Sequence, residues 1–208
     1  EEIVIQEFEV ESAKKAVIDA EHSLIDKIND AFTKSDDAIR NRIDRMFSNP
    51  RSSNPKLSFV TGDSVLAYQI EFDRLVIESI LNNWATSITS LSLSDNLDAY
   101  TKEALNNLNK IKDFLNKISL AVNSLNQSAN LTQTTIDTYR SETSTARINV
   151  NLAISNLLAT DEKLRGATSL LSISSQQLIL KQSGSLDTQI NAQQARLDQV
   201  TANVENVN

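Results

Sequence analysis

The single histidine is the side chain best suited to acid–base or metal chemistry at neutral pH, and it stands alone in this sequence. His22 lies between Glu21 and Ser23 in a stretch with helical periodicity. A zinc site or a general base would need a partner constellation, such as a second histidine at helical spacing, and the sequence contains none. We therefore interpret His22 as a solvated side chain on a helix.

Clustered carboxylates are the residue type that calcium prefers. They are Asp36 with Asp37 in one group, and Asp19, Glu21 and Asp26 in another. An EF-hand loop needs a glycine among its acidic residues, and neither group has one. Carboxylates on helices are usually the partners of nearby cations, which here are Lys27, Lys34 and Arg40. The sequence predicts no metal ion and no other cofactor.

Other groups that catalysis could use also lack a constellation around them. No serine lies in a nucleophile elbow, and the 3 glycines are too scattered for a phosphate-binding loop. Trp84, the only tryptophan, has the spacing of the inward face of its helix, which favours a core side chain over a ligand-stacking one. We expect that the chain is not an enzyme.

The composition is that of an all-α protein with few connections. Only 3 Gly and 2 Pro are available to turn 208 residues, so the backbone can reverse at few places. The net charge of -7 disfavours nucleic acid and anionic membranes as partners, because both require a basic face. No apolar run reaches the roughly 18 to 20 residues of a membrane span, so we expect no membrane insertion by this segment.

A long coiled-coil seam organises the second half of the chain. Its positions follow at alternating steps of three and four residues: Ile136, Tyr139, Thr143, Ala146, Val150, Ala153, Leu157, Thr160, Leu164, Ala167, Leu171, Ser174 and Leu178. Many of these residues are small, so a partner helix can approach closely. An uninterrupted helix over 132–182 would be roughly 75 Å long, which suits a spacer better than the wall of a catalytic pocket.

The pattern predicts one helical domain over residues 1–208, an elongated antiparallel bundle that narrows into a coiled-coil hairpin. We expect five helices, at about 5–47, 64–91, 95–125, 132–182 and 185–207. Apolar residues off the seam predict a second partner for the fourth helix: Ile148, Leu152, Ile154 and Leu158. Gly184 is the expected joint after that helix, where the chain either kinks and continues or reverses sharply.

Two longer turns should lie at one end of this bundle. The first contains two Asn-Pro pairs and carries Leu57, Phe59 and Val60, which either cover their own core or contact a protein partner. The second contains Gln127 and Asn130. We predict these five residues as candidates for partner contact.

The C-terminal part of the chain resembles the last helices of periplasmic adaptor subunits of the membrane fusion protein family, the hemolysin-D-like secretion adaptors. The resemblance rests on residues 177–197, which read QLILKQSGSLDTQINAQQARL. The stretch from SDDAIR (35–40) to NPRSSNP (49–55) is similar to an expanded helical insertion of some bacterial adaptors. The Arg-Leu-Ser tip motif of duct-docking adaptors is absent, because Asp198 follows Leu197 within a helix.

The resemblance implies a helical spacer and docking domain that bridges an inner-membrane transporter toward an outer component in an efflux or export assembly. It further implies flanking lipoyl-like halves, an extracytoplasmic location, and homo-oligomers of the full-length protein. Because the sequence opens without Met and stops within a helical repeat, we expect a segment of a larger chain. The alternative is an extracytoplasmic sensory or signalling bundle, in which small helix shifts carry information.

Overall fold

The computed structural model describes residues 2–205, with side chains described for residues 2–184 and 186–200. Its elements confirm the all-α prediction. They are α1 (Glu2–Asp36), the π-helix η1 (Asp37–Arg42), the 3₁₀ helix η2 (Ile43–Met46), β1 (Phe47–Ser48), β2 (Lys56–Leu57), α2 (Ser64–Ile88), α3 (Leu97–Asn123) and α4 (Gln133–Glu205). No helix within these residues combines the length and apolar character needed to cross a membrane.

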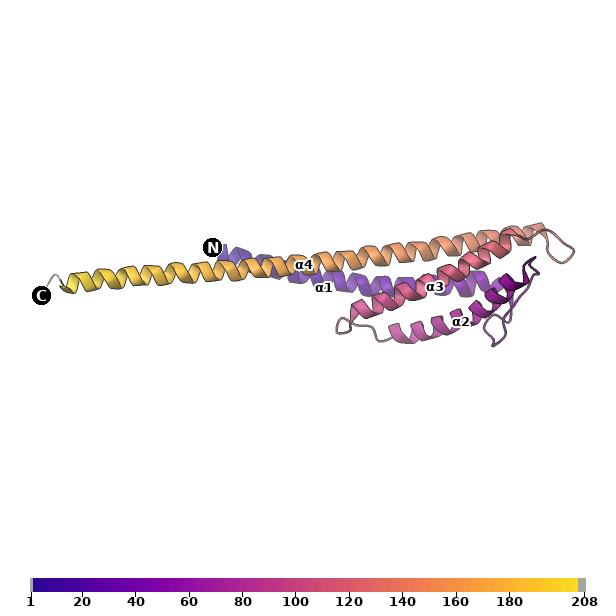
Figure 1. Cartoon of the computed structure of the whole chain (residues 1–208), viewed down its shortest axis with the longest axis horizontal. Coiled ribbons are helices and arrows are strands. Elements are labelled where there is room, and N and C mark those ends of the chain that lie inside the picture. The colour runs from indigo at the N-terminus through magenta and orange to yellow at the C-terminus, as the bar shows by residue number, and fades with distance from the viewer. Residues whose placement is uncertain (1, 206–208) are drawn as a thin grey trace. The chain divides into compact units, whose positions relative to one another are not determined.

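The chain forms two compact units. Unit 2 comprises Glu21–Glu162 and contains the end of α1, all of α2 and α3, and the beginning of α4. Unit 1 comprises Glu1–Ala20 and Lys163–Asn208, so its two parts come from α1 and α4. The short links between α2, α3 and α4 make successive helices of unit 2 antiparallel (Figure 1).

The core of unit 2 is built from aliphatic side chains of all four helices. Its fully enclosed members include Leu24, Ile28, Ile70, Leu81, Leu108, Ile111, Leu115, Val150 and Leu157. Trp84 belongs to this core: it is 1% exposed and lies edge-on to Phe32, with the ring centroids 5.7 Å apart. Its burial agrees with the inward spacing seen in the sequence.

The predicted seam of α4 matches the buried face of the helix. Within unit 2, Ile136, Thr143, Ala146 and Val150 are buried, and Tyr139 is half-buried. The small seam residues Thr143 and Ala146 are therefore buried, as their spacing in the sequence predicted.

The expected first helix, 5–47, is wrong beyond Asp36. The backbone widens to a π-helix over Asp37–Arg42 and then tightens to a 3₁₀ helix over Ile43–Met46. Asp37 accepts hydrogen bonds from Asn41 and Arg42, four and five residues on, and the second spacing suits a π turn. Ala38, Ile39, Ile43 and Met46 along this irregular stretch are all buried.

The link that follows is a small antiparallel hairpin that the sequence did not predict. Phe47 pairs with Leu57, and Ser48 pairs with Lys56. Asn49 adopts a positive φ of 52° directly after β1, a conformation that asparagine tolerates better than most residues. The Asn-Pro pairs thus form the loop of a hairpin.

Each of the helices α2, α3 and α4 begins directly after a side chain that caps its N-terminus. The Asp63 carboxylate accepts from the backbone N–H groups of Val65 and Leu66, as expected for an N-cap. Asn96 caps α3, and the Thr132 hydroxyl accepts from the Thr135 N–H before α4. The predicted ranges 64–91 and 95–125 therefore hold, apart from a few residues at the ends.

Unit 1 is a pair of helices with a partly polar seam. Val10 and Ala13 of α1 are buried in it. Gln6 is 3% exposed and donates from Nε2 to the Ser174 carbonyl and to Gln177 Oε1, both at 3.4 Å. Gln6 thus joins the start of α1 to the middle of α4, and the two helices run in opposite directions (Figure 1).

Two expectations about α4 are wrong. The first is that a second helix packs on the apolar residues off the seam. Of these residues, Ile148, Leu152 and Leu158 are each about half exposed, and only Ile154 is half-buried. Side chains on both flanks of the seam cannot all face the bundle, because they lie too far apart around the helix.

The second concerns the joint, because α4 continues through Gly184 as regular helix. Gly184 does not have the positive φ that marks a glycine helix end. A Cβ added at this position would meet nothing within 4 Å. The expected helices 132–182 and 185–207 are therefore one, and the chain does not reverse at Gly184. The side chain of Ser185, expected as a cap, and residue 207 lie outside what the structure describes.

We predict that Gly184→Ala stabilises α4 locally by roughly 0.5–1 kcal/mol, because glycine inside a helix costs that much relative to alanine. A Cβ at this position meets nothing within 4 Å. Amide hydrogen exchange over residues 180–188 should slow. Gly62→Ala is the control, since Gly62 lies in a loop with equal space around it and should leave this segment unchanged. Faster amide exchange over residues 180–188 in Gly184→Ala would show that the helix ends at Gly184, where alanine would then be strained.

Candidate protein-binding site at the turn end of the bundle

The two longer turns contact neighbouring residues at the start of α4, Tyr139 for the first turn and Arg140 for the second. The Tyr139 ring lies 5.7 Å from Phe59 of the first turn, and its hydroxyl is 3.3 Å from Ser58 Oγ. The neighbouring Arg140 donates to the carbonyls of Val122 and Leu125, at 3.3 and 3.1 Å, and so closes the second turn. The two turns therefore lie at one end of unit 2, as the sequence predicted (Figure 1).

The three candidate residues of the first turn have different surroundings. Leu57 is half-buried and its N–H donates to Glu71 Oε1 at 3.1 Å. Phe59 is buried against Tyr139 and therefore covers the core. Val60 is 92% exposed, so an apolar side chain of this turn is free to contact a partner.

The two candidate residues of the second turn are both exposed. Gln127 precedes a tight reversal in which Ser128 and Leu131 exchange backbone hydrogen bonds of 3.0 and 3.3 Å, and Asn130 lies within that reversal. This bridge holds the backbone of the turn, so its polar side chains project from an ordered scaffold. Val60, Gln127 and Asn130 are thus the exposed candidates of the predicted set.

Behind the turns, a buried network of charged side chains fixes the path of the chain. Arg74 of α2 has no exposed surface. It donates from Nε to Asp44 Oδ1 at 2.7 Å and from Nη2 to Glu78 Oε2 at 2.9 Å. Arg40 shares Glu78 at 2.9 Å, and Arg51 of the hairpin loop shares Asp44 at 3.2 Å.

This network was not predicted from the sequence. The i,i+4 spacing of Arg74 and Glu78 is visible in the sequence, but such pairs are usually solvated. The contact with Asp44 spans 30 residues and depends on the 3₁₀ turn that carries it. A basic residue on the inward face of an otherwise apolar helix was the one available signal.

A second group of charges ties η1 to α4. Arg42 donates to Asp37 Oδ2 at 3.0 Å and to Glu142 Oε2 at 2.6 Å. The hydrogen bond from Asn41, together with Arg42, lowers the pKa of Asp37 below its ordinary 3.8. The hydrogen bond to Glu142, with the charge of Asp37, raises the pKa of Arg42. Both groups are therefore ionised at neutral pH, and the contact is a charge-assisted link between two helices.

The residues first considered for chemistry are dispersed. His22 is exposed on α1. Asp36 lies 3.3 Å from Arg40, so this carboxylate has the cationic partner that the sequence predicted. Among the described residues, no group of three or more histidine, aspartate or glutamate side chains is placed to hold a metal ion. The arrangement therefore consists of exposed turn residues on a backbone that buried ion pairs hold in place.

Comparisons of the chain with protein-family models, with curated proteins and with solved structures find no match. The resemblance to membrane fusion proteins therefore stays a prediction that rests on residues 177–197 and on the stretch 35–55.

We predict that Arg74→Ala lowers the free energy of unfolding of unit 2 by about 3–5 kcal/mol, because it leaves Asp44 and Glu78 without their buried cation. Urea unfolding followed by the fluorescence of Trp84, which lies in the same core, measures this loss. Arg147→Ala is the matched control: this exposed arginine bonds only Asn116 and Ser119 among the described residues, and its loss should cost less than about 1 kcal/mol. Equal losses of unfolding free energy in the two variants would show that the buried network does not stabilise unit 2 more than an exposed contact does.

We predict that stability depends on the protonation of Asp37. Since its pKa is lower in the folded chain than in the unfolded one, its contribution is present above pH 3.8 and is lost as the pH falls through the folded value. Asp37→Asn should therefore reduce the loss of unfolding free energy between about pH 5 and pH 2. Glu11→Gln, in an exposed pair with Lys14, should leave that dependence unchanged. Identical pH profiles for Asp37→Asn and the parent chain would contradict the assignment.

Proposed function

We propose that this chain is a helical spacer and docking domain of an efflux or secretion adaptor. Its task is to bridge a membrane transporter to other components of the cell envelope. The observation that supports this most directly is the topology: α1 and α4 pair in unit 1, and the chain between them carries the α2–α3 hairpin of unit 2. An outgoing and a returning helix are what a bridging hairpin needs.

The seam residues suit a spacer mechanically. Small side chains such as Ala146, Ala153 and Thr160 are buried on α4, so the partner helix can lie close along this face. Two helices that share a seam resist bending better than one. The separation between what is attached at one end and what is bound at the other is then set by helix length, at about 1.5 Å per residue.

The turn end suits docking. Val60 is an exposed apolar side chain on an ordered hairpin, and Gln127 and Asn130 are uncharged polar side chains on an ordered turn. Together they favour a protein partner over an ionic or nucleic-acid one. In this proposal the turns contact an envelope protein, and full-length copies assemble around the transporter. The location is extracytoplasmic.

We predict that a photoreactive benzoylphenylalanine at Val60 or at Asn130 crosslinks the full-length protein to an envelope protein in the cells that produce it. The reason is that these side chains project from the turn end into solvent. Crosslinked partners are identified by mass spectrometry after illumination. The same photoreactive residue at Ser155, exposed on the side of α4, is the control and should give fewer crosslinks.

Crosslinks from the turn positions to cytoplasmic proteins alone would contradict the adaptor. Crosslinks that are equally frequent at Ser155 would contradict docking through the turns while leaving a spacer intact.

A further inference from the structure

The outer face of α2 carries a stripe of large apolar side chains that the bundle does not cover. We call it the α2 stripe. It consists of Val65, Tyr68, Phe72, Leu75 and Val76, which are 66%, 69%, 55%, 39% and 38% exposed. Their spacing of three and four residues is that of a helix-packing seam. The opposite face of α2, with Ile70, Ile77 and Leu81, is already buried in the core of unit 2. The helix therefore has two apolar faces, of which one is used.

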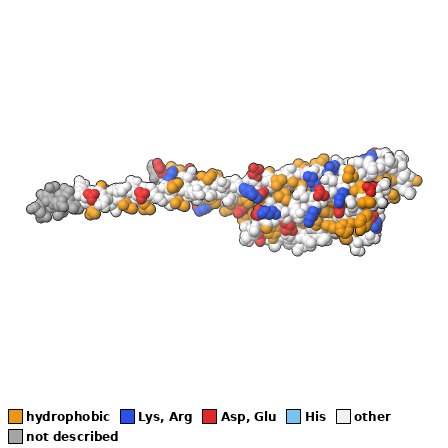
Figure 2. All heavy atoms as spheres, in the orientation of Figure 1, with side chains coloured by type: hydrophobic (Ala, Val, Ile, Leu, Met, Phe, Trp, Pro, Cys, Tyr) orange, Lys and Arg blue, Asp and Glu red, His pale blue; other side chains and the backbone are white. Residues whose placement is uncertain are grey.

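The α2 stripe contains no charge. All four charged side chains of α2 bind other parts of unit 2: Glu71 binds Lys56 at 2.6 Å, Asp73 binds Lys117 at 2.7 Å, Arg74 binds Asp44 at 2.7 Å, and Glu78 binds Arg40 at 2.9 Å. The exposed residues between the apolar ones are uncharged, among them Gln69, Ser79 and Asn83. Hydrophobic side chains are visible on the outside of the bundle in the region of α2 (Figure 2). This face is therefore uncharged, although the chain as a whole has a net charge of -7.

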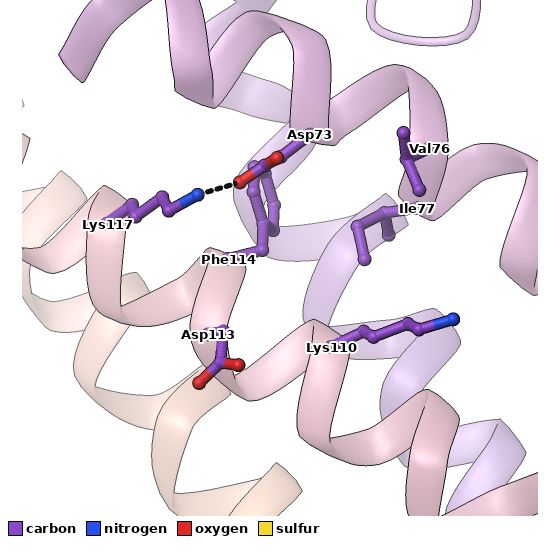
Figure 3. A pocket seen from close by; sticks show the side chains of 7 residues that line it. All are labelled: Asp73, Val76, Ile77, Lys110, Asp113, Phe114 and Lys117. Atoms are coloured by element: carbon purple, nitrogen blue, oxygen red, sulfur yellow. Dashed lines mark hydrogen bonds and ion pairs between the residues drawn. The ribbon is translucent and has the colours of Figure 1, made fainter.

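A hollow of about 180 Å³ lies beside the stripe, between α2 and α3. Val76 and Ile77 line it from α2, and Phe114 lines it from α3 (Figure 3). Its rim is polar: Asp73 and Lys117 form an ion pair there, and Lys110 and Asp113 stand beside it. An aromatic ring fits a space of this size, since a cavity of about 150 Å³ can hold benzene.

The stripe is complementary to itself when a second copy lies antiparallel across it. Phe72 is at the centre, with the large Tyr68 four residues before it and the small Val76 four residues after it. An antiparallel copy therefore places its Tyr68 opposite Val76, next to the hollow between α2 and α3. Val65 then faces Ser79, another small residue. Tyr68 thus meets a small side chain on either side of the centre, while the two Phe72 rings meet each other on the two-fold axis.

Charge and area favour a second copy as the occupant. Any contact between two copies of a chain of net charge -7 is repulsive where unpaired acidic side chains meet, and the two acidic residues that flank Phe72 each have a lysine partner in their own copy: Glu71 pairs with Lys56, and Asp73 pairs with Lys117. Two half-exposed aromatic rings and three aliphatic side chains per copy give an interface on the order of 1,000 Å² in total. That is the lower limit for a specific interface, so the contact is reversible.

We propose that the α2 stripe is a two-fold, antiparallel self-association surface of this chain, in which Tyr68 of each copy enters the hollow lined by Val76, Ile77 and Phe114 of the other. The contact is isologous, because the same patch serves on both sides. It rests on unit 2 alone and does not depend on the adaptor function.

Sedimentation velocity over a concentration series that reaches about 1 mM tests this, since even a millimolar dissociation constant gives substantial dimer there. The parent chain should pass from monomer to dimer. Phe72→Glu should raise the dissociation constant at least about tenfold, because two carboxylates would meet on the two-fold axis. Ile148→Glu is the matched control, since Ile148 is equally exposed on α4, and dimerisation should persist. A parent chain that stays monomeric, a dimer that survives Phe72→Glu, or equal loss in both variants would each overturn the proposal.

A cysteine version needs no destabilising charge and also fixes the direction of the helices. The chain contains no cysteine, so every disulfide must come from the introduced residues. A mixture of Tyr68→Cys and Val76→Cys chains, oxidised and analysed on non-reducing gels, should give the mixed dimer in excess over either homodimer. Phe72→Cys alone should form a homodimer, and Ile148→Cys should not. An excess of the two homodimers in the mixture would indicate parallel helices and would overturn the antiparallel contact.

Discussion

The burial of Arg74 is the constraint on which the architecture of unit 2 depends. A guanidinium with no exposed surface must be matched by carboxylates, because an unpaired buried charge would cost several kcal/mol. Asp44 can reach it only from η2, and Glu78 reaches it from one turn farther along α2. The irregular end of α1, the hairpin and α2 are thereby held in one arrangement. Packing of methyl groups alone would specify their relative positions less strictly, since apolar contacts have no direction.

The helices and their buried faces could be read from the sequence because both follow from periodicity. Spacing of three and four residues identified Thr143, Ala146 and Val150 as inward-facing, and the same rule identified Trp84. Helix starts were equally legible, since Asp63 and Thr132 are side chains that cap a helix by a local hydrogen bond. These features depend on residues within a turn or two of one another, so a single sequence contains the information.

What the sequence could not reveal depends on contacts between distant residues. The π-helix at Asp37–Arg42 is stabilised by Glu142, one hundred residues away, and nothing local to η1 indicates that partner. At Gly184 the error had the opposite origin: the local signal of a Ser-Gly-Ser sequence predicts a helix end, but continuing hydrogen bonds along α4 outweigh the propensity of one glycine. The exposed candidates at the turns, Val60 and Asn130, were found because turns are surface features by construction.

The inward use of charge also determines the character of the surface. Because Glu71, Asp73 and Glu78 all bind cations of their own unit, α2 has no ionised group left for its outer face. In unit 1 the seam buries the polar side chain of Gln6, which donates to the Ser174 carbonyl, beside the apolar Val10 and Ala13. A polar seam with hydrogen bonds of 3.4 Å contributes less to stability than the apolar core of unit 2. The large apolar core and the uncharged outer face therefore belong to the same unit, so a contact surface there would be preorganised.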